Sequence, residues 1–176
     1  MLGNKPGAFE RLVREYQGLC WHVVQRMVRH PEDTRELCQE AFLRVHRKLH
    51  QYRFDAPLKS WIGQVAYSVA KRHLERRRIP LHEEDGEHGS ALDQVPDAFD
   101  LAGAVEGEER AGLLHAAIEA LPPLARTILT LYHLDDVPLA EIARITGLPE
   151  GTIKSHLFRS RQRLRAWLEP RIGVAA

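Results

Sequence analysis

The sequence is poor in cysteine and lacks any long apolar run. Its 176 residues include two cysteines, Cys20 and Cys38, whose positions have no spacing typical of metal ligands. Such cysteines are typical of free thiols in a reducing compartment, so we expect no disulfide. No apolar run approaches the roughly 18–20 residues that a membrane span needs. The start, residues 1–13, also lacks the segments of a signal peptide. We therefore expect a cytoplasmic protein with no membrane insertion.

Sequence signatures of enzymes are missing as well. There is no Gly-rich phosphate loop, nucleophile elbow or paired-cysteine site in the sequence. His46 and His50 are four residues apart, as zinc ligands on a helix can be. The stretch HRKLH nevertheless lacks the glutamate that a metalloprotease needs, and no third ligand is evident. We expect no catalytic residues, no bound metal and no cofactor.

The alternation of period two that marks β-strands is absent too, and apolar residues recur instead at steps of three and four. This spacing predicts amphipathic helices. In the first half, helices are expected from Phe9 to near His30, from Pro31 to about Leu49, and from Leu58 to about Leu74. The second half predicts a short helix through Leu113 and Ile118, one opened by Pro122, and two around Gly147. The expected fold class is all-α.

Charge is distributed unevenly along the chain. Residues 1–80 hold 16 Lys and Arg against 8 Asp and Glu, residues 81–120 hold 1 against 11, and residues 121–176 hold 8 against 5. Two basic blocks on either side of an acidic one indicate a nucleic-acid partner or electrostatic self-association. The acidic stretch has no sustained apolar period. We therefore predict two small helical domains, residues 1–80 and 109–176, joined by an acidic flexible linker at 81–108.

The stretch LAEIARITGLPEGTIKSHLFRSRQRL, residues 139–164, has the spacing of a helix-turn-helix. Gly147 stands where a left-handed residue is expected to end the first helix. A helical wheel turns one set of second-helix residues toward a core: Ile153, Leu157, Ser160, Leu164 and Leu168. Phe158 points away among basic residues, where an aromatic ring suits contact with a thymine methyl or a stacked base. Alternatively, Phe158 caps the core edge or packs on another helix.

Taken together, the two blocks resemble a bacterial RNA polymerase sigma factor of the extracytoplasmic-function (ECF) group. LPEGTIKSHLFRSRQRL is similar to the recognition helix of region 4 in that family. DTRELCQEAFLRVHRKL, followed by LKSWIGQVAYSVAKRHLERRR, is similar to region 2. The resemblance implies a subunit without catalysis of its own. Such a subunit binds core RNA polymerase, melts the minus-10 promoter element with region 2 and reads the minus-35 element with region 4.

The resemblance also implies roles for individual positions. Those that match polymerase-binding positions are Asp33, Glu36, Gln39 and Glu40. Those that match minus-10 DNA contacts, including a loop that captures a flipped base, are Tyr52, Arg53, Phe54, Lys59, Trp61, Ser68, Lys71 and Arg72. Those that match minus-35 DNA contacts are Thr152, Lys154, Ser155, His156, Phe158, Arg159 and Arg163. His156 replaces a frequent arginine and Ser68 a frequent asparagine, so both bear on which promoters are read. Trp61 is equally compatible with the core.

Two other functions, an enzyme and a one-component DNA-binding regulator, are alternatives to a sigma factor. An enzyme is disfavoured by the missing signatures. A one-component helix-turn-helix regulator would bind DNA independently of polymerase and take a ligand in the first block, but the basic third helix favours nucleic acid there. Only eight residues follow Leu168, so we expect no further regulatory domain. The resemblance implies regulation by a separate anti-sigma factor.

Overall fold

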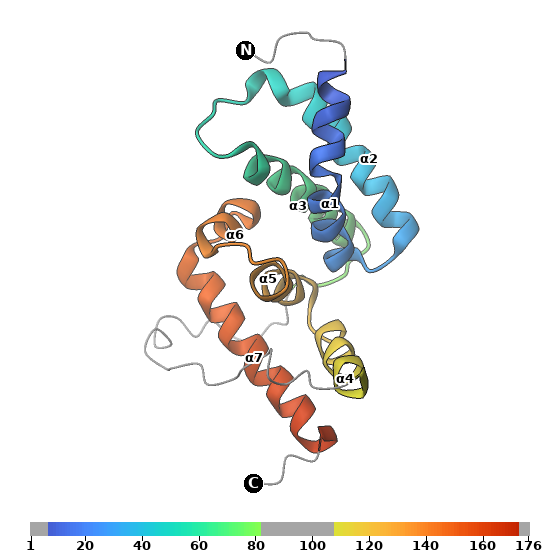
Figure 1. Ribbon diagram of the computed structural model, residues 1–176, viewed down its shortest axis with the longest axis vertical. Helices are drawn as coiled ribbons and strands as arrows, with labels where there is room; N and C mark the ends of the chain where they lie inside the picture. Colours follow the sequence, from blue (N-terminus) through green and yellow to red (C-terminus); the bar gives the residue numbers. More distant parts are fainter. Residues whose placement is uncertain (1–6, 82–107, 173–176) are drawn as a thin grey trace.

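The computed structural model describes residues 7–81 and 108–172, most of which form helices (Figure 1). In chain order these are α1 (Ala8–Val28), α2 (Pro31–Lys48), the short 3-10 helix η1 (Leu49–Gln51), α3 (Leu58–Arg76), α4 (Glu108–Glu119), α5 (Pro123–His133), α6 (Leu139–Thr146) and α7 (Glu150–Ile172). No strand occurs in these two ranges. The all-α prediction is confirmed. Apart from its end residues, the linker expected at 81–108 lies outside the described part of the chain.

The first bundle consists of α1, α2 and α3, each packed on the other two. Arg29 ends α1 in a left-handed conformation, with φ 67°, and its N–H donates to the carbonyl oxygen of Gln25 at 2.9 Å. Pro31 then opens α2, where the missing proline N–H has no intrahelical partner to lose. The buried residues of α1 all belong to the apolar residues that recur at steps of three and four: Leu12, Cys20, Val23, Val24 and Met27. Periodicity therefore predicted this bundle correctly.

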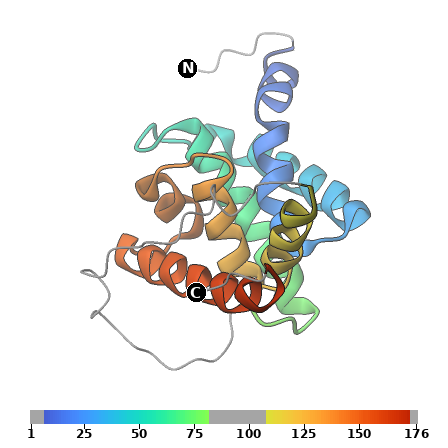
Figure 2. The same ribbon diagram turned by 60° about the horizontal axis from the view of Figure 1, so that its bottom comes forward.

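The second bundle consists of α4 to α7, with α7 packed on the other three helices. Its central element is α5, in which residues 124–131 are all buried. An amphipathic helix buries one stripe only, so burial on all sides requires neighbours on all sides. Helix α7 covers one side of α5 and α1 of the first bundle covers another. In Figures 1 and 2, α5 accordingly lies between α7 and the first bundle.

The two bundles are in contact rather than separate. Helix α3 packs on α6 and α1 packs on α5, and the buried apolar side chains of both bundles form one hydrophobic cluster. Small domains bury only about 60% of their unfolded-chain surface, so a shared core adds burial that neither block has alone. The sequence indicated two blocks but gave no sign of this contact.

The described ranges hold neither a membrane span nor a metal cluster. None of their helices combines the length and apolar character that crossing a membrane requires. Within the same ranges, no three or more His, Cys, Asp or Glu side chains are grouped as metal ligands would be.

Candidate nucleic-acid and polymerase interfaces

Helices α6 and α7 form the predicted helix-turn-helix. Gly147 adopts φ 75°, and its N–H donates to the carbonyl oxygen of Ala143 at 2.8 Å, which ends α6. The Thr146 hydroxyl donates to the Ile142 carbonyl oxygen at 2.8 Å and accepts from the Leu148 N–H at 3.3 Å. The turn is thus fixed by local bonds, and a side chain at residue 147 would be strained by the left-handed backbone.

Helix α7 has one buried face, and its other sides carry the residues predicted to contact the minus-35 element. The core side chains expected from the wheel are all buried: Ile153, Leu157, Ser160, Leu164 and Leu168. The minus-35 candidates lie on the remaining sides, with Lys154 exposed and the others partly exposed: Thr152, Ser155, His156, Phe158, Arg159 and Arg163. Phe158 is not among the described apolar side chains that pack on the hydrophobic cluster. Its side chain is partly exposed.

Two of these candidates are positioned by the backbone of α7 itself. The Ser155 hydroxyl donates to the Gly151 carbonyl oxygen at 3.0 Å, and Arg159 Nε donates to the Ser155 carbonyl oxygen at 3.4 Å. Residues four apart lie one above the other on a helix, so Ser155 and Arg159 share one face. The Arg159 bond uses one of five guanidinium donors. The geometry suits an acceptor such as a guanine edge or a phosphate.

An aromatic cluster stands beside the start of α3. The ring centroids of Tyr52 and Phe54 are 4.6 Å apart, and those of Tyr52 and Trp61 are 5.3 Å apart. The Tyr52 hydroxyl donates to the carbonyl oxygen of Ala56. Phe54 is 69% exposed and adopts φ 61°, an uncommon conformation for a bulky residue. The structure thus brings together three minus-10 candidates and holds one large ring in solvent, where it is free to stack on an unpaired base.

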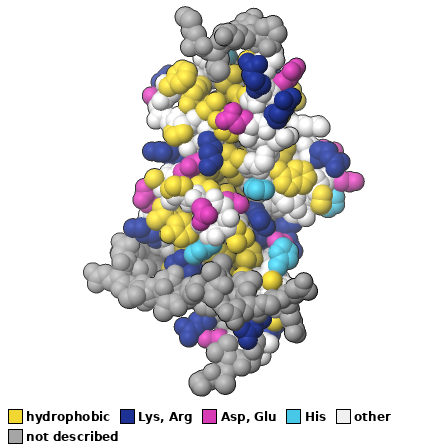
Figure 3. All heavy atoms as spheres, viewed as in Figure 1, with side chains coloured by type: hydrophobic (Ala, Val, Ile, Leu, Met, Phe, Trp, Pro, Cys, Tyr) yellow, Lys and Arg dark blue, Asp and Glu magenta, His cyan; other side chains and the backbone are white. Residues whose placement is uncertain are grey.

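The basic candidates of α3 do not all share one side of the helix. Ser68, Lys71 and Arg72 are exposed, and Lys71 Nζ lies 3.9 Å from the Glu75 carboxylate. Lys59 lies nine residues before Ser68, which is two and a half turns at 3.6 residues per turn and places the two on opposite sides of the helix. It faces α6, where its Nζ is 3.5 Å from a Glu141 carboxylate oxygen. Lysine and arginine side chains on the face in Figure 3 are likewise scattered among acidic and apolar ones.

The polymerase-binding candidates on α2 differ in availability. Glu36 and Gln39 are exposed, and Glu40 is partly exposed and paired with Arg44 one turn later. Asp33 is mostly covered, and its carboxylate lies 3.1 Å from Arg77 Nη1 and 3.5 Å from His73 Nε2. Asp33 therefore joins α2 to the end of α3, while the other three remain accessible.

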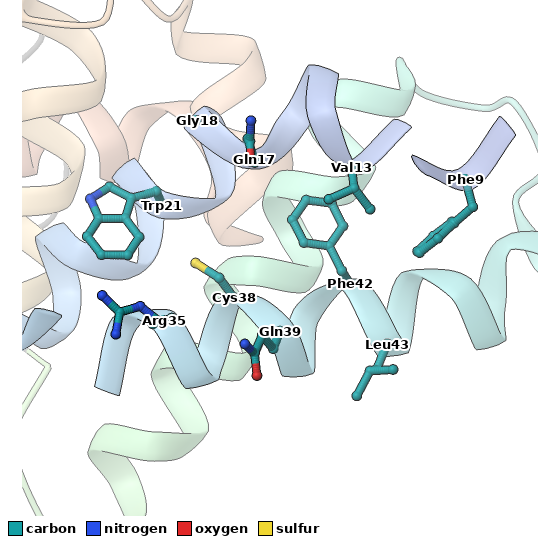
Figure 4. A pocket seen from close by; sticks show the side chains of 10 residues that line it. All are labelled: Phe9, Val13, Gln17, Gly18, Trp21, Arg35, Cys38, Gln39, Phe42 and Leu43. Carbon is teal, nitrogen blue, oxygen red and sulfur yellow. The ribbon is translucent and has the colours of Figure 1, made fainter. Parts of the chain in front are cut away.

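An apolar groove of about 680 Å³ runs between α1 and α2 beside these residues. Figure 4 shows Val13 and Trp21 of α1 across from Cys38 and Phe42 of α2, with Leu43 nearby. Leu43 is 58% exposed although it is a large apolar residue. The sequence analysis did not identify Leu43 as a candidate. Its position outside the buried stripe of α2 is the feature that indicates an exposed apolar residue.

The two cysteines lie next to each other between α1 and α2. Both are free thiols, Cys20 buried and Cys38 partly exposed at the groove. A hydrogen bond between the two side chains, together with burial, raises the pKa of Cys20, and the same bond lowers the pKa of Cys38. Cys38 is accordingly the more readily ionised of the two. The spacing of the two residues in the sequence does not reveal this proximity.

Comparison with known proteins separates the chain into two matching segments. Residues 12–79 match the family model for Sigma-70 region 2, and residues 111–164 match the model for Sigma-70, region 4. The ECF RNA polymerase sigma-E factor of Escherichia coli strain K12 is 33% identical over 174 residues, covering 94% of this chain and 88% of the relative. This chain belongs to the ECF sigma factors. The RNA polymerase sigma-H factor of Pseudomonas aeruginosa is 30% identical over 173 residues, covering 96% and 90%.

Solved structures share the fold of this ECF sigma factor. The sigma factor RpoE from Bartonella quintana, in complex with the anti-sigma factor NepR, matches with a TM-score of 0.66 at 17% identity, over 94% of this chain and 99% of that one. CnrH, in complex with the cytosolic domain of CnrY, matches with a TM-score of 0.66 at 17% identity, over 97% and 93%. The two-block, all-α architecture of this sigma factor is thus that of a known fold.

Proposed function

We propose that this ECF sigma factor binds core RNA polymerase and directs initiation at promoters by reading their minus-35 and minus-10 elements. The observation that carries the proposal is that one chain contains two different features suited to DNA binding. One is a basic helix-turn-helix, suited to a duplex groove, and the other is an exposed aromatic cluster, suited to unpaired bases.

The minus-35 element is read by α7. Its buried stripe anchors the helix, and the opposite sides carry hydroxyl, imidazole, aromatic and guanidinium groups: Thr152, Lys154, Ser155, His156, Phe158, Arg159 and Arg163. Phosphate contacts set the register of such a helix, while contacts with base edges provide sequence specificity. His156 has fewer donors than the arginine frequent in the family, which shifts the preferred base at that position.

The minus-10 element is opened by the segment around η1 and α3. Phe54 stacks on an extruded base beside Tyr52 and Trp61, and Arg53 supplies charge at the loop. Ser68, Lys71 and Arg72 then follow the backbone of the separated strand along the exposed side of α3. Lys59 joins this surface only when α6 releases it, because it is paired with Glu141 here.

Core polymerase docks on the α1–α2 groove and its acidic rim. Glu36, Gln39 and Glu40 meet basic groups of the partner, and the exposed Leu43 supplies apolar surface whose burial adds affinity. Asp33 contributes mainly by holding the end of α3 against α2. The matched sigma factor from Bartonella quintana is bound to the anti-sigma factor NepR, and we propose that an anti-sigma factor also regulates this chain.

We assign one functional segment to each of the three charge blocks of the sequence. Residues 1–80 form region 2, residues 81–108 the acidic linker and residues 109–176 region 4. The chain acts in the cytoplasm, where the polymerase and its DNA are, and contributes no catalytic group, metal or cofactor of its own.

A one-component regulator differs from a sigma factor in one measurable property. The regulator binds its operator alone with roughly nanomolar affinity, whereas a sigma factor needs core polymerase to act at a promoter. The aromatic cluster favours the sigma factor, because a regulator that reads duplex DNA has no use for an exposed stacking ring. Run-off transcription with purified core polymerase separates the two functions, since only a sigma factor starts transcripts at a defined site.

Replacing Arg159 by Ala tests the role of α7. The variant removes a guanidinium suited to a base edge or phosphate, so we expect binding of the minus-35 element by the holoenzyme to weaken by about 1–3 kcal/mol. Quantitative footprinting on a promoter of this holoenzyme measures the effect. Arg165→Ala is the matched control, because Arg165 is exposed on α7 but engaged with Glu169 at 2.6 Å. Equal minus-35 protection in both variants would remove Arg159 from the site.

A further inference from the structure

The two cysteines of the chain face each other across the contact between α1 and α2. Cys38 lines the apolar groove, as do Gly18 and Trp21 of α1, and Cys20 belongs to the same helical turn as those two residues. In Figure 4 the sulfur of Cys38 points from α2 toward α1. The side chains of Cys20 and Cys38 are hydrogen-bonded to each other. The packing of α1 on α2 thus brings the only two thiols of the sequence together.

The two thiols differ in their access to small molecules and in their readiness to ionise. Cys20 is completely buried, whereas Cys38 is partly exposed at the groove. The hydrogen bond with Cys20, which is the donor when Cys38 is ionised, lowers the pKa of Cys38, although burial acts in the opposite direction. The nucleophile in cysteine chemistry is the thiolate. Cys38 is therefore the thiol that reacts first, and Cys20 is within reach to react second.

A metal site does not account for this pair. Within residues 7–81 and 108–172, neither cysteine belongs to a group of three or more side chains arranged as metal ligands would be. An accessible, ionisable cysteine beside a second thiol is instead the arrangement found in redox sensors. In a reducing compartment such pairs form a disulfide only transiently. The two thiols are therefore suited to respond to an oxidant.

We propose that Cys38 and Cys20 form a reversible disulfide in response to a hydroperoxide, and that this disulfide weakens the docking of core polymerase on the α1–α2 groove. The first part concerns the free protein alone. The second part rests on the proposed function, because it assigns the groove to the polymerase.

The reaction has two steps and consumes one molecule of hydrogen peroxide. First, the ionised sulfur of Cys38 attacks a peroxide oxygen, so that an S–O bond forms and the O–O bond breaks. The leaving hydroxide takes up the proton that Cys38 released, and Cys38 becomes a sulfenic acid. Next, the sulfur of Cys20 attacks the sulfur of Cys38. The S–S bond forms, the S–O bond breaks, and the leaving hydroxide takes the Cys20 proton as water. Each sulfur loses one electron and the peroxide gains two.

The disulfide changes the shape of the groove. Covalently bonded sulfur atoms lie much closer together than two hydrogen-bonded thiols, so α1 and α2 must approach or rotate where Cys20 and Cys38 meet. Gln39 follows Cys38 on α2, and Phe42 lies one turn later. Both residues line the groove. Packed surfaces complement each other closely, so a small shift of these helices reduces the fit of a partner in the groove.

Oxidation of the purified full chain tests the disulfide. The wild type, Cys20→Ala and Cys38→Ala are treated with hydrogen peroxide and analysed by thiol titration, non-reducing electrophoresis and peptide mass mapping. We expect the wild type to stay monomeric, to lose both thiols together with a mass lower by two hydrogen atoms, and to recover both thiols with dithiothreitol. Cys20→Ala should instead accumulate sulfenic or sulfinic acid at Cys38, because the second thiol is missing. Cys38→Ala should keep its buried thiol.

Binding of core polymerase tests the effect on docking. Peroxide is removed before core enzyme is added, so that only this protein is oxidised. We expect the oxidised wild type to bind at least about five-fold more weakly than the reduced form, the loss expected when one or two methylene groups of the partner lose their contact in the groove. Dithiothreitol should restore the affinity. Cys38→Ala has the same methionines but cannot form the disulfide, so peroxide should leave its affinity as it was before treatment.

Three results separate the parts of this account. A wild type that keeps both thiols under peroxide, or that forms only dimers linked between chains, refutes the disulfide. A disulfide that forms without weakening polymerase binding refutes the effect on docking. A reduced wild type that neither binds core polymerase nor starts a specific transcript refutes the proposed function, and it leaves the chemistry of the two thiols in the free protein unaffected.

Discussion

Replacing Leu43 by Asp is expected to abolish stable association with core RNA polymerase. Leu43 is a large apolar residue with 58% exposure at the rim of the α1–α2 groove. In a docked complex a carboxylate there would be desolvated, next to the acidic residues Glu36 and Glu40. Losing the burial of a leucine side chain costs about 1.5–3 kcal/mol and the unpaired carboxylate adds to this cost, so we expect the dissociation constant to rise roughly 30-fold to 1,000-fold. Co-purification with core enzyme and a titration by fluorescence anisotropy measure it.

Leu134→Asp provides the matched control for this prediction. Leu134 is 51% exposed, but it follows α5 in the second bundle and is not one of the residues that line the groove. The two variants carry the same change of charge and of apolar surface. If both bind core enzyme equally well, the groove is not the docking surface. Because Leu43 is exposed, unchanged thermal unfolding should accompany the loss of binding.

Replacing Arg126 by Ala is expected to lower the free energy of unfolding more than the other substitutions proposed for this protein. The change leaves carbonyl groups from two bundles without a donor and creates a cavity in a buried position. Removing one partner from a buried charged network typically costs about 3–5 kcal/mol. At about 2–4 °C per kcal/mol for a chain of this size, the melting temperature should fall by about 10 °C. Thermal unfolding followed by circular dichroism measures the change.

Two further variants make this result specific. Arg144→Ala removes an exposed arginine from the neighbouring helix α6 and should leave the melting temperature within about 2 °C of the wild type. Arg126→Lys keeps the charge, but a single ammonium cannot reach both sets of carbonyl groups, so its stability should be clearly below that of the wild type. Equal melting temperatures for Arg126→Ala and Arg144→Ala would contradict the bonding described for Arg126.

Local rules explain why the helices were predictable. The stripe of α1, the proline that opens α2 and the glycine that ends α6 all depend on residues within a few positions of one another. The two faces of α7 followed from the same arithmetic, and its five expected core residues are buried. The helical period also predicts that Lys59 and Ser68 lie on opposite sides of α3, although the family resemblance assigns both residues to contacts with the minus-10 element.

The contacts that distinguish this structure depend on distant parts of the chain. Arg126 reads as an ordinary basic residue in LPPLARTIL, and nothing nearby indicates that its acceptors lie at the end of α1. Gly63 looks like a small residue on a helix until α6 packs against it. The proximity of Cys20 and Cys38 arises only from the packing of α1 on α2. Tertiary packing selected these partners, and periodicity contains no information about them.

Run-off transcription with purified bacterial core polymerase tests the central claim most directly. Genomic promoter templates are transcribed with core alone, with this protein alone and with both, and the 5′ ends of the products are mapped. We expect discrete transcripts only when both are present, with minus-35 protection that weakens in Arg159→Ala and no product with Leu43→Asp. Tight binding to a DNA site by the protein alone, with no specific transcript from any template, would contradict the assignment and favour a one-component regulator.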